Sequence, residues 1–409
     1  MIKIPIDQVR LGVTIVKTDK PWLNLSFMNK PVTSLDIIDI LKNYGVKEVY
    51  IKKDEITEDL YGLEKSFKKE LIKQAERLDI TKYTTTLKEI DELKSLHERA
   101  KKITKQLYLD VRTGKSIDTE TAKKVVETFV DSCFKKPHLV VTLSRLKSFD
   151  EYTFVHSLNV GILSIVLGKR YGFDVPGLKN LGLGALLHDI GKMKISDKIL
   201  NKPGKLTDEE FAIMKKHPVY GFELLKNDPN MTEEALHAVY LHHERADGSG
   251  YPLGLKEPQI HLYAKIVSIV DVYDAITSRR VYHDAMLPPK ALQTIFSWSE
   301  KHFNKILVKF FMEVVGIYPV GTLVLLDTGE LAIVFEQNKE DPTRPKVLVI
   351  TDERKKTTEP YLFDLEKYNL LTQKPYKSII APLDPKKLNI DTNKIMDKFL
   401  LKAKQGVSI

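Results

Sequence analysis

The feature that most constrains the fold is a change of apolar spacing after a long helical region. Nearly all of residues 136–316 has the spacing typical of helices, interrupted by Gly/Pro loops. The sequence then changes to short β-like runs with a hairpin-turn signal between the first two, at 322–326, 331–335 and 346–350. We therefore expect a mainly α protein whose helical bundle is followed by a small β-rich region.

Composition and pattern divide the chain into four parts. Short β-like runs flank a helical stretch near the N-terminus, and a highly charged segment with apolar residues at helical spacing follows. We expect a small α+β N-terminal module at 1–60, an amphipathic helical linker region at 61–135, a helical core at 136–316 and a small β-rich region at 317–409.

Cysteine and charge usage limit the classes of protein that fit. The single Cys133 cannot form an intramolecular disulfide or a thiolate zinc cluster, which favours a reducing compartment. The N-terminus has no signal-peptide core, and the longest uncharged run, 152–168, is too short to span a bilayer. We expect a cytoplasmic protein that does not enter a membrane.

Most of the net charge of +9 lies in the middle of the chain, 61–316, which has 40 basic and 33 acidic residues. This excess suits an anionic ligand such as a phosphate ester, although it is also typical of a solvated lysine-rich surface. No arginine stripe with interleaved aromatic residues is present, so nucleic acid is not an expected partner.

The helical core contains a spaced series of histidines and aspartates. Each alone is more often a surface or core residue than a ligand, but His188-Asp189 ends an apolar segment, 183–187, where burial requires a compensating partner or ion. Imidazole and carboxylate suit Fe, Mn, Ni, Co or Zn, and the number of candidates exceeds one tetrahedral site. We expect two cations that share a carboxylate, an arrangement suited to phosphoester hydrolysis. The candidate ligands are His156, His188, Asp189, His217, His242, His243 and Asp271.

A helix boundary lies just before one of these candidates. Thr207 and Glu210 form a capping-box pattern that starts a helix. Pro218 directly follows His217. We expect this helix to end at His217.

The candidates resemble the H…HD…D signature of the HD metal-dependent phosphohydrolase superfamily. The segment HHERADGSGYP at 242–252 matches the HHExxDGxGYP pattern of the HD-GYP subfamily. The resemblance covers about 148–315, and residues 1–60 resemble the small domain often found ahead of this core. It implies a helical-bundle, HD-type catalytic core.

The resemblance implies a cyclic di-GMP phosphodiesterase that forms pGpG, or alternatively GMP, with a metal-bridging hydroxide as the nucleophile. It implies that all seven candidates are metal ligands and that Asp189 is the bridging carboxylate. The catalytic assignments are Asp189 and Lys192, and the substrate contacts are Lys192, Arg280, Tyr251 and His283. His283 departs from the Arg or Lys usual at its position.

The resemblance also bears on the number of metals and on protein partners, whereas the sequence does not fix the identity of the metal. Relatives with a third metal often have Glu four residues before the first histidine, where this chain has Tyr152, so we expect two divalent cations. Fe or Mn is favoured, and Ni, Co, Zn or Mg are alternatives. The Gly-Tyr-Pro loop implies diguanylate cyclase (GGDEF) domains as partners. Helices at 61–135 could pair in a homo-oligomer, although packing on their own core is favoured.

Other functions and residues stay open at this point. The alternatives are an HD hydrolase of another cyclic dinucleotide or of a nucleoside triphosphate, and a catalytically weak module that binds the nucleotide or a cyclase domain. The Gly-Tyr-Pro motif weighs against the triphosphate. The remaining histidines are interpreted as structural or surface residues: His97, His138, His237, His261 and His302.

Overall fold

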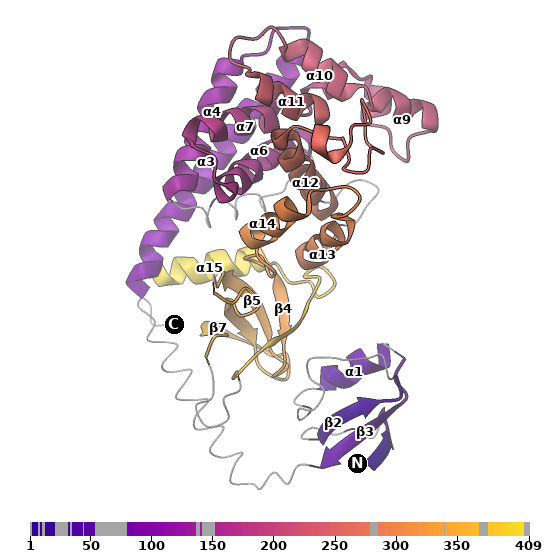
Figure 1. Cartoon of the computed structure of the whole chain (residues 1–409). Helices are drawn as coiled ribbons and strands as arrows, with labels where there is room; N and C mark the ends of the chain where they lie inside the picture. The colour runs from indigo at the N-terminus through magenta and orange to yellow at the C-terminus, as the bar shows by residue number, and fades with distance from the viewer. Residues whose placement is uncertain are drawn as a thin grey trace. The chain divides into compact units, whose positions relative to one another are not determined.

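The computed structural model describes residues 2–6, 9, 13–20, 32, 35–43, 45–53, 80–135, 140, 152–278, 285–338, 340–367 and 375–404. The chain divides into two compact units. One comprises Lys88–Ile317, and the other joins Met1–Leu87 to Tyr318–Ile409. Figure 1 labels helices and strands of both units. No helix within the described residues is both long and apolar enough to cross a membrane.

The unit of residues 88–317 is a bundle of helices. Its long helices are α3 (Ile80–Arg112, from residue 88), α4 (Thr119–Lys135), α6 (Tyr152–Tyr171), α7 (Val175–Leu187), α10 (His217–Leu225), α11 (Glu233–Leu241), α12 (Leu262–Thr277), α13 (Pro288–Trp298) and α14 (Lys305–Val315). Short elements connect them: η2 (Ile190–Lys194), α8 (Asp197–Leu200), α9 (Asp208–Met214) and η3 (Glu257–Gln259).

Helix α6 lies at the centre of this bundle because it is apolar on nearly all sides. Leu158 and Ile162 join the apolar cluster shared with α3, α4, α7 and α11. Val160 and Leu163 join a second cluster with α12, α13 and α14. A polar residue near the start of α6 is therefore held deep inside the protein.

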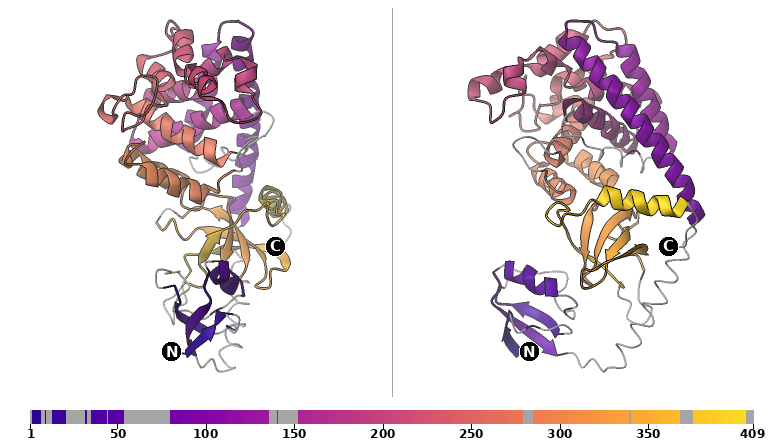
Figure 2. Two further views of the ribbon diagram at one scale, coloured as in Figure 1. Left: turned by 90° about the vertical axis from the view of Figure 1, so that its right-hand side faces the viewer. Right: turned by 180° about the vertical axis from the view of Figure 1, so that it is seen from behind.

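Helices α3 and α4 contribute apolar residues to the first of these clusters, and Figure 2 shows them running along the bundle. Tyr108 of α3 and Phe129 of α4 are buried among residues of α6 and α7. From Leu93 onwards, the stretch expected to be an amphipathic linker thus packs on the helical core of its own chain.

The other unit contains two small sheets. The N-terminal sheet has the order β1-β3-β2 and is antiparallel, built from β1 (Ile2–Pro5), β2 (Val13–Thr18) and β3 (Glu48–Lys53). Helix α1 (Leu35–Asn43) buries Ile37 and Leu41 in the same cluster as Ile15 and Val49.

The C-terminal sheet is also antiparallel, with the order β7-β6-β5-β4-β8. Its strands are β4 (Leu323–Leu326), β5 (Leu331–Glu336), β6 (Lys346–Thr351), β7 (Thr357–Asp364) and β8 (Ile379–Pro382), and helix α15 (Thr392–Lys404) follows. The predicted fold class is confirmed: a mainly α helical core with a small α+β N-terminal module and a β-rich C-terminal region.

One predicted helix boundary is wrong. The capping box is present in α9, where Thr207 Oγ1 accepts from the Glu210 amide at 3.3 Å and the Glu210 carboxylate accepts from the Thr207 amide at 2.8 Å. However, α9 ends at Met214, and His217 is the first residue of α10. Proline is tolerated in the first turn of a helix, where its missing N–H is not needed, so Pro218 starts a helix here instead of ending one.

Candidate metal centre

The structure brings all seven predicted ligands into one buried cluster. They come from α6, the junction of α7 and η2, the start of α10, the end of α11 and the middle of α12. Their ligand atoms include two groups in which every member lies within 4.8 Å of the others. One group is Asp189, His217, His242 and His243, and the other is His156, His188 and Asp189. Asp189 is the residue common to both.

Backbone carbonyls fix the direction of three of the imidazoles. In His188, His217 and His242, Nδ1 lies 2.7, 2.8 and 2.9 Å, respectively, from the carbonyl oxygen three residues earlier. A carbonyl only accepts, so each Nδ1 carries the hydrogen. Each Nε2 therefore presents its lone pair to the centre of the cluster.

The two oxygens of Asp189 face different imidazoles. Oδ1 lies 3.3 Å from Nε2 of His217 and 3.9 Å from Nε2 of His242. Oδ2 lies 3.4 Å from Nε2 of His188, 3.7 Å from Nε2 of His156 and 2.6 Å from Nζ of Lys192. One carboxylate thus borders both groups of ligand atoms.

The cluster has the chemistry of a cation site. Among the described residues, Oδ1 of Asp189 and Nε2 of His188 are buried with no hydrogen-bond partner. Buried acceptors are normally satisfied, because leaving one unpaired costs roughly 1–3 kcal/mol. A divalent cation accepts electron pairs from both atom types, so this donor set fits it.

Asp271, on α12, also lies in the cluster. Its Oδ1 lies 3.0 Å from Nε2 of His156 and 4.0 Å from Nε2 of His188. Its Oδ2 lies 3.8 Å from Nδ1 of His243. Asp271 therefore contacts histidines of both groups, as Asp189 does.

A glycine allows the two sides of the cluster to meet. A Cβ on Gly191 of η2 would lie 2.0 Å from the carbonyl oxygen of His217 and 2.4 Å from the amide nitrogen of Gly221. Both neighbours are backbone atoms of α10, so only glycine permits this approach. The contact holds His217 next to Asp189.

Burial and neighbouring charges set the protonation of the cluster. Burial lowers the pKa of His217, of His242 and, to about 3, of His243, so these rings are neutral at pH 7. Burial alone would raise the pKa of Asp189, but its contacts with His188, Lys192 and His217 hold that pKa well below its usual range. The cluster thus offers neutral imidazoles and an ionised carboxylate, the states that bind metal.

His156 has the opposite shift. Burial by itself lowers the pKa of His156, but hydrogen bonds to Asp271 and Asp274 outweigh it and raise that pKa to about 9. A cation at Nε2 would compete with a proton at this ring.

Asp274 is a residue of the site that sequence reasoning missed. Its Oδ2 accepts from Nδ1 of His156 at 2.8 Å and from the hydroxyl of Ser278 at 3.2 Å, and its Oδ1 accepts from the amide of Asn159 at 3.1 Å. A carboxylate behind a metal-binding histidine fixes the ring and increases its basicity. The available signal was its position one turn after Asp271 on the same helix.

The Gly-Tyr-Pro loop is built on a buried carboxylate. Glu244 accepts from the backbone amides of residues 253, 254 and 255 at 2.7, 3.1 and 2.9 Å. The ring of Tyr251 stacks on His243, with 4.7 Å between ring centroids and 29° between planes. Tyr251 therefore lies directly against a predicted ligand.

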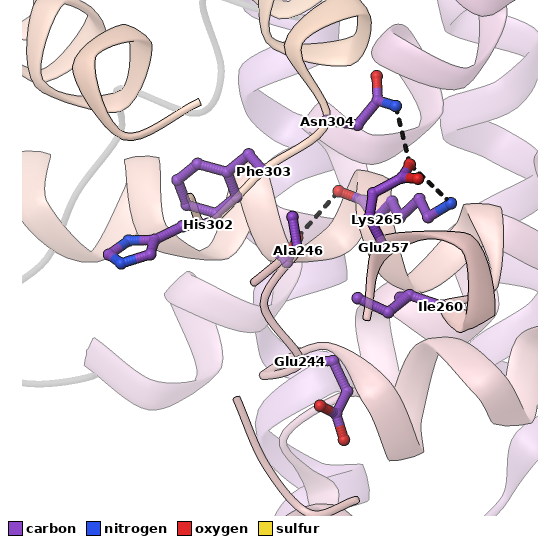
Figure 3. Close-up of a pocket in the computed structure, with 9 residues that line it drawn as sticks. Glu244, Ala246, Glu257, Ile260, Lys265, His302, Phe303 and Asn304 are labelled. Atoms are coloured by element: carbon purple, nitrogen blue, oxygen red, sulfur yellow. Dashed lines mark hydrogen bonds and ion pairs between the residues drawn. The ribbon is translucent and has the colours of Figure 1, made fainter. Parts of the chain in front are cut away.

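A small pocket lies behind this loop (Figure 3). Glu257 accepts from Lys265 and from Asn304, both at 2.9 Å, and the amide of Ala246 donates to the carbonyl of His302 at 3.1 Å. None of the seven predicted ligands is in the described lining of the pocket. Its polar contacts tie the loop to the chain around Asn304.

Two predicted substrate contacts, Arg280 and His283, lie outside the described residues, as does His138. Lys192 is described, and its ammonium group points at Asp189. Of the histidines interpreted as structural or surface residues, His97 is fully buried.

Comparison with protein families matches three parts of the chain. Residues 134–306 match an HD domain, residues 1–122 match a domain of unknown function (DUF3391), and residues 323–389 match a KOW domain associated with HD domains. The seven predicted ligands all lie in the first of these parts.

Curated relatives match most of the chain or its core. The protein named cyclic di-GMP phosphodiesterase PA4108, from Pseudomonas aeruginosa, is 36% identical over 368 residues, 88% of this chain and 87% of that protein. A cyclic di-GMP phosphodiesterase of Thermotoga maritima is 35% identical over 214 residues, 52% of this chain and 55% of its own. The 3'3'-cGAMP-specific phosphodiesterase 2 of Vibrio cholerae is 35% identical over 190 residues, 46% of this chain and 36% of its own.

The near full-length match and the HD-domain match agree with the segment at 242–252. The chain belongs to the HD-GYP family of cyclic di-GMP phosphodiesterases, within the HD phosphohydrolase superfamily.

Proposed function

We propose that this protein is a metal-dependent phosphodiesterase that opens cyclic di-GMP to linear pGpG. The observation that carries the proposal is the pair of ligand groups that share Asp189. When bound there, two divalent cations would neutralise charge developing on the phosphodiester and generate a nucleophile from water. Fe or Mn is the proposed metal, because both suit imidazole and carboxylate ligands.

The proposed ligands are the seven residues of the cluster. The group on one side of Asp189 would hold one cation through His217, His242 and His243, and the group on the other side would hold the second through His156 and His188. Asp271 borders both groups. Asp189 is proposed as the bridge, because its two oxygens face the two groups.

Charge at the site suits a substrate with two phosphates. Two divalent cations would carry more positive charge than the carboxylates of Asp189 and Asp271 neutralise, and Lys192 adds a further positive charge. We propose that Lys192 turns from Asp189 to a substrate phosphate when cations are bound. Arg280, His283 and Tyr251 are proposed substrate contacts on the resemblance of their motifs, and Tyr251 also contacts His243.

A second candidate substrate is another cyclic dinucleotide. The Vibrio cholerae relative is named for 3'3'-cGAMP, which differs from cyclic di-GMP in one base. His283 occupies a position where the family usually has Arg or Lys, so one base or phosphate contact differs here.

The test is chromatography of products after anaerobic incubation with Fe(II) or Mn(II). We expect pGpG from cyclic di-GMP, and any GMP that appears will show that a second bond is cut. The same incubation with 3'3'-cGAMP gives the ratio of the two rates. No turnover of either compound by protein carrying two metals per chain contradicts the proposal and favours a binding module.

We extend the proposal to a partner and a location. Leu253, at the Gly-Tyr-Pro loop, is 55% exposed. The loop is the proposed contact for a diguanylate cyclase domain. The single Cys133 favours the cytoplasm.

Asp274→Asn should weaken binding of one cation without unfolding the protein. His156 and Asn159 donate to different oxygens of Asp274, so an amide at this position places an N–H₂ donor against one of the two donors and the His156 ring loses its fixed orientation. Loss of such an outer carboxylate typically costs about 10–100-fold in metal affinity. Titration with Mn(II) measures the change, with the exposed Asp131→Asn as control. Two unchanged binding constants would show that Asp274 does not act on the metal ligand.

A further inference from the structure

Helix α3 contains a buried histidine that points towards the cluster from outside the HD-domain match. His97 is fully buried, and its Nε2 lies 3.5 Å from Oδ1 of Asn159 on α6. Among the described residues, Nδ1 of His97 has no hydrogen-bond partner. An amide oxygen only accepts, so Nε2 carries the hydrogen and His97 is the donor. Burial lowers the pKa of His97, which keeps the ring neutral with one N–H.

The hydrogen bonds from His97 and from His156 meet at the carboxylate of Asp274. The Asn159 amide N–H₂ donates to Oδ1 of Asp274 at 3.1 Å, and Nδ1 of His156 donates to Oδ2 of Asp274 at 2.8 Å. Nε2 of His156 is left facing Asp271 at 3.0 Å. All four side chains are at most 2% exposed, so bulk water does not compete for these bonds.

These hydrogen bonds depend on the orientation of the side-chain amide of Asn159. With its oxygen held by His97, Asn159 must present N–H to the carboxylate of Asp274. If the donor of His97 is removed, the amide can turn and place its oxygen against that carboxylate. Two acceptors in contact repel, and Asp274 would then move relative to His156.

We propose that His97 is a positioning residue for the metal centre: it fixes the amide of Asn159 and thereby aligns Asp274 with the ligand His156. The inference rests on the proposed function in one respect, namely that His156 binds a cation. It adds a residue from the N-terminal matched region, 1–122, to a site whose ligands all lie in the HD-domain match.

Two other side chains of α3 contact the same segments. The hydroxyl of Tyr108 lies 2.8 Å from Oγ of Ser157, next to His156, and 3.0 Å from the carbonyl oxygen of Leu186, two residues before His188. Arg112 donates to the carbonyl of Ile195 at 2.9 Å, directly after η2. Helix α3 therefore contacts the backbone or side chains beside ligands on both α6 and α7.

The test compares three substitutions in the full chain. His97→Leu removes the donor, whereas His97→Gln retains an N–H that can reach Asn159. Thr104→Val is the matched control, because Thr104 is buried on the same helix and its hydroxyl donates only within the helix, to Ala100. We expect His97→Leu to weaken Mn(II) binding at one site by about tenfold, the low end for residues behind metal ligands. His97→Gln and Thr104→Val should bind as the unmodified protein does.

A second measurement follows His156 without metal. Nitrogen-15 spectra of histidine-labelled, metal-free protein report which ring nitrogen carries the hydrogen, and His156→Ala assigns the signal. We expect the hydrogen-bonded Nδ1–H signal of His156 to shift in His97→Leu and to stay in His97→Gln. If His97→Leu lowers the melting temperature but leaves both Mn(II) affinity and this signal unchanged, His97 is a packing residue and the inference is overturned.

These measurements distinguish failure of the His97 inference from failure of the proposed function. Metal affinity and the His156 signal do not require turnover, so a protein that binds Mn(II) but cleaves no cyclic dinucleotide overturns only the proposed function. If the unmodified protein binds no Mn(II), the proposed function fails, and the spectra alone decide whether His97 orients His156.

Discussion

Asp189→Ala is expected to lose both cations and phosphodiesterase activity while the helical bundle stays folded. Both groups of ligand atoms depend on this carboxylate. Loss of charge neutralisation at the phosphodiester, worth several kcal/mol, corresponds to a fall in kcat of about 10³-fold or more. The bundle should survive, because the histidines left behind at His217, His242 and His243 are neutral. Metal analysis per chain, circular dichroism and the product assay measure the three effects.

The matched control for this substitution is Asp131→Ala, which removes an exposed carboxylate from α4. It should keep two metals per chain and full activity. An Asp189→Ala protein that still carries two metals per chain would refute the bridging role.

Gly191→Ala is expected to destabilise the protein strongly, because the added methyl group meets backbone atoms of α10. The new Cβ would lie 2.0 Å from one backbone atom of α10 and 2.4 Å from another, so η2 and α10 must separate. Overpacking of this kind typically costs about 1–3 kcal/mol and occasionally more. Separation would also lengthen the 3.3 Å contact between His217 and Asp189, so metal binding should fall as well.

Urea unfolding measures this effect, with Gly161→Ala as control. Gly161 is also in the core, on α6, but its added Cβ would meet Leu186 at 3.6 Å, an ordinary contact. Alanine also has the higher helix propensity, so this control should be neutral or stabilising. Equal urea midpoints for the two variants would show that η2 and α10 can separate at little cost.

The candidate ligands could be predicted from local signals at two residue pairs and from the resemblance of the whole spaced set to a known signature. His188-Asp189 ends a buried apolar segment, and His242-His243 precedes a loop rich in glycine. What the sequence lacks is the spatial relation between them. The opposite directions of the two oxygens of Asp189, and the role of Asp274 behind His156, depend on how α6, α7 and α12 pack.

The sequence predicted the helices and strands better than it predicted what each of them packs against. The apolar runs at 331–335 and 346–350 became β5 and β6 with nearly the expected bounds. Pro218, in contrast, is compatible with a helix end and with a first turn, and the structure shows that it lies in the first turn of α10. An amphipathic helix such as α3 looks the same in sequence whether it covers its own core or another chain.

In this protein the end of the N-terminal family match is not the border of a compact unit, because helix α3 lies inside that match and also belongs to the bundle. The N-terminal match ends at residue 122, yet the compact bundle begins at residue 88 and includes α3. A fragment cut to the HD-domain match, 134–306, would expose the apolar residues of α6 that α3 and α4 cover. Replacing residues 1–122 with an unrelated domain would remove the α3 residues that cover this apolar surface, so the replacement would have to supply an equivalent helix.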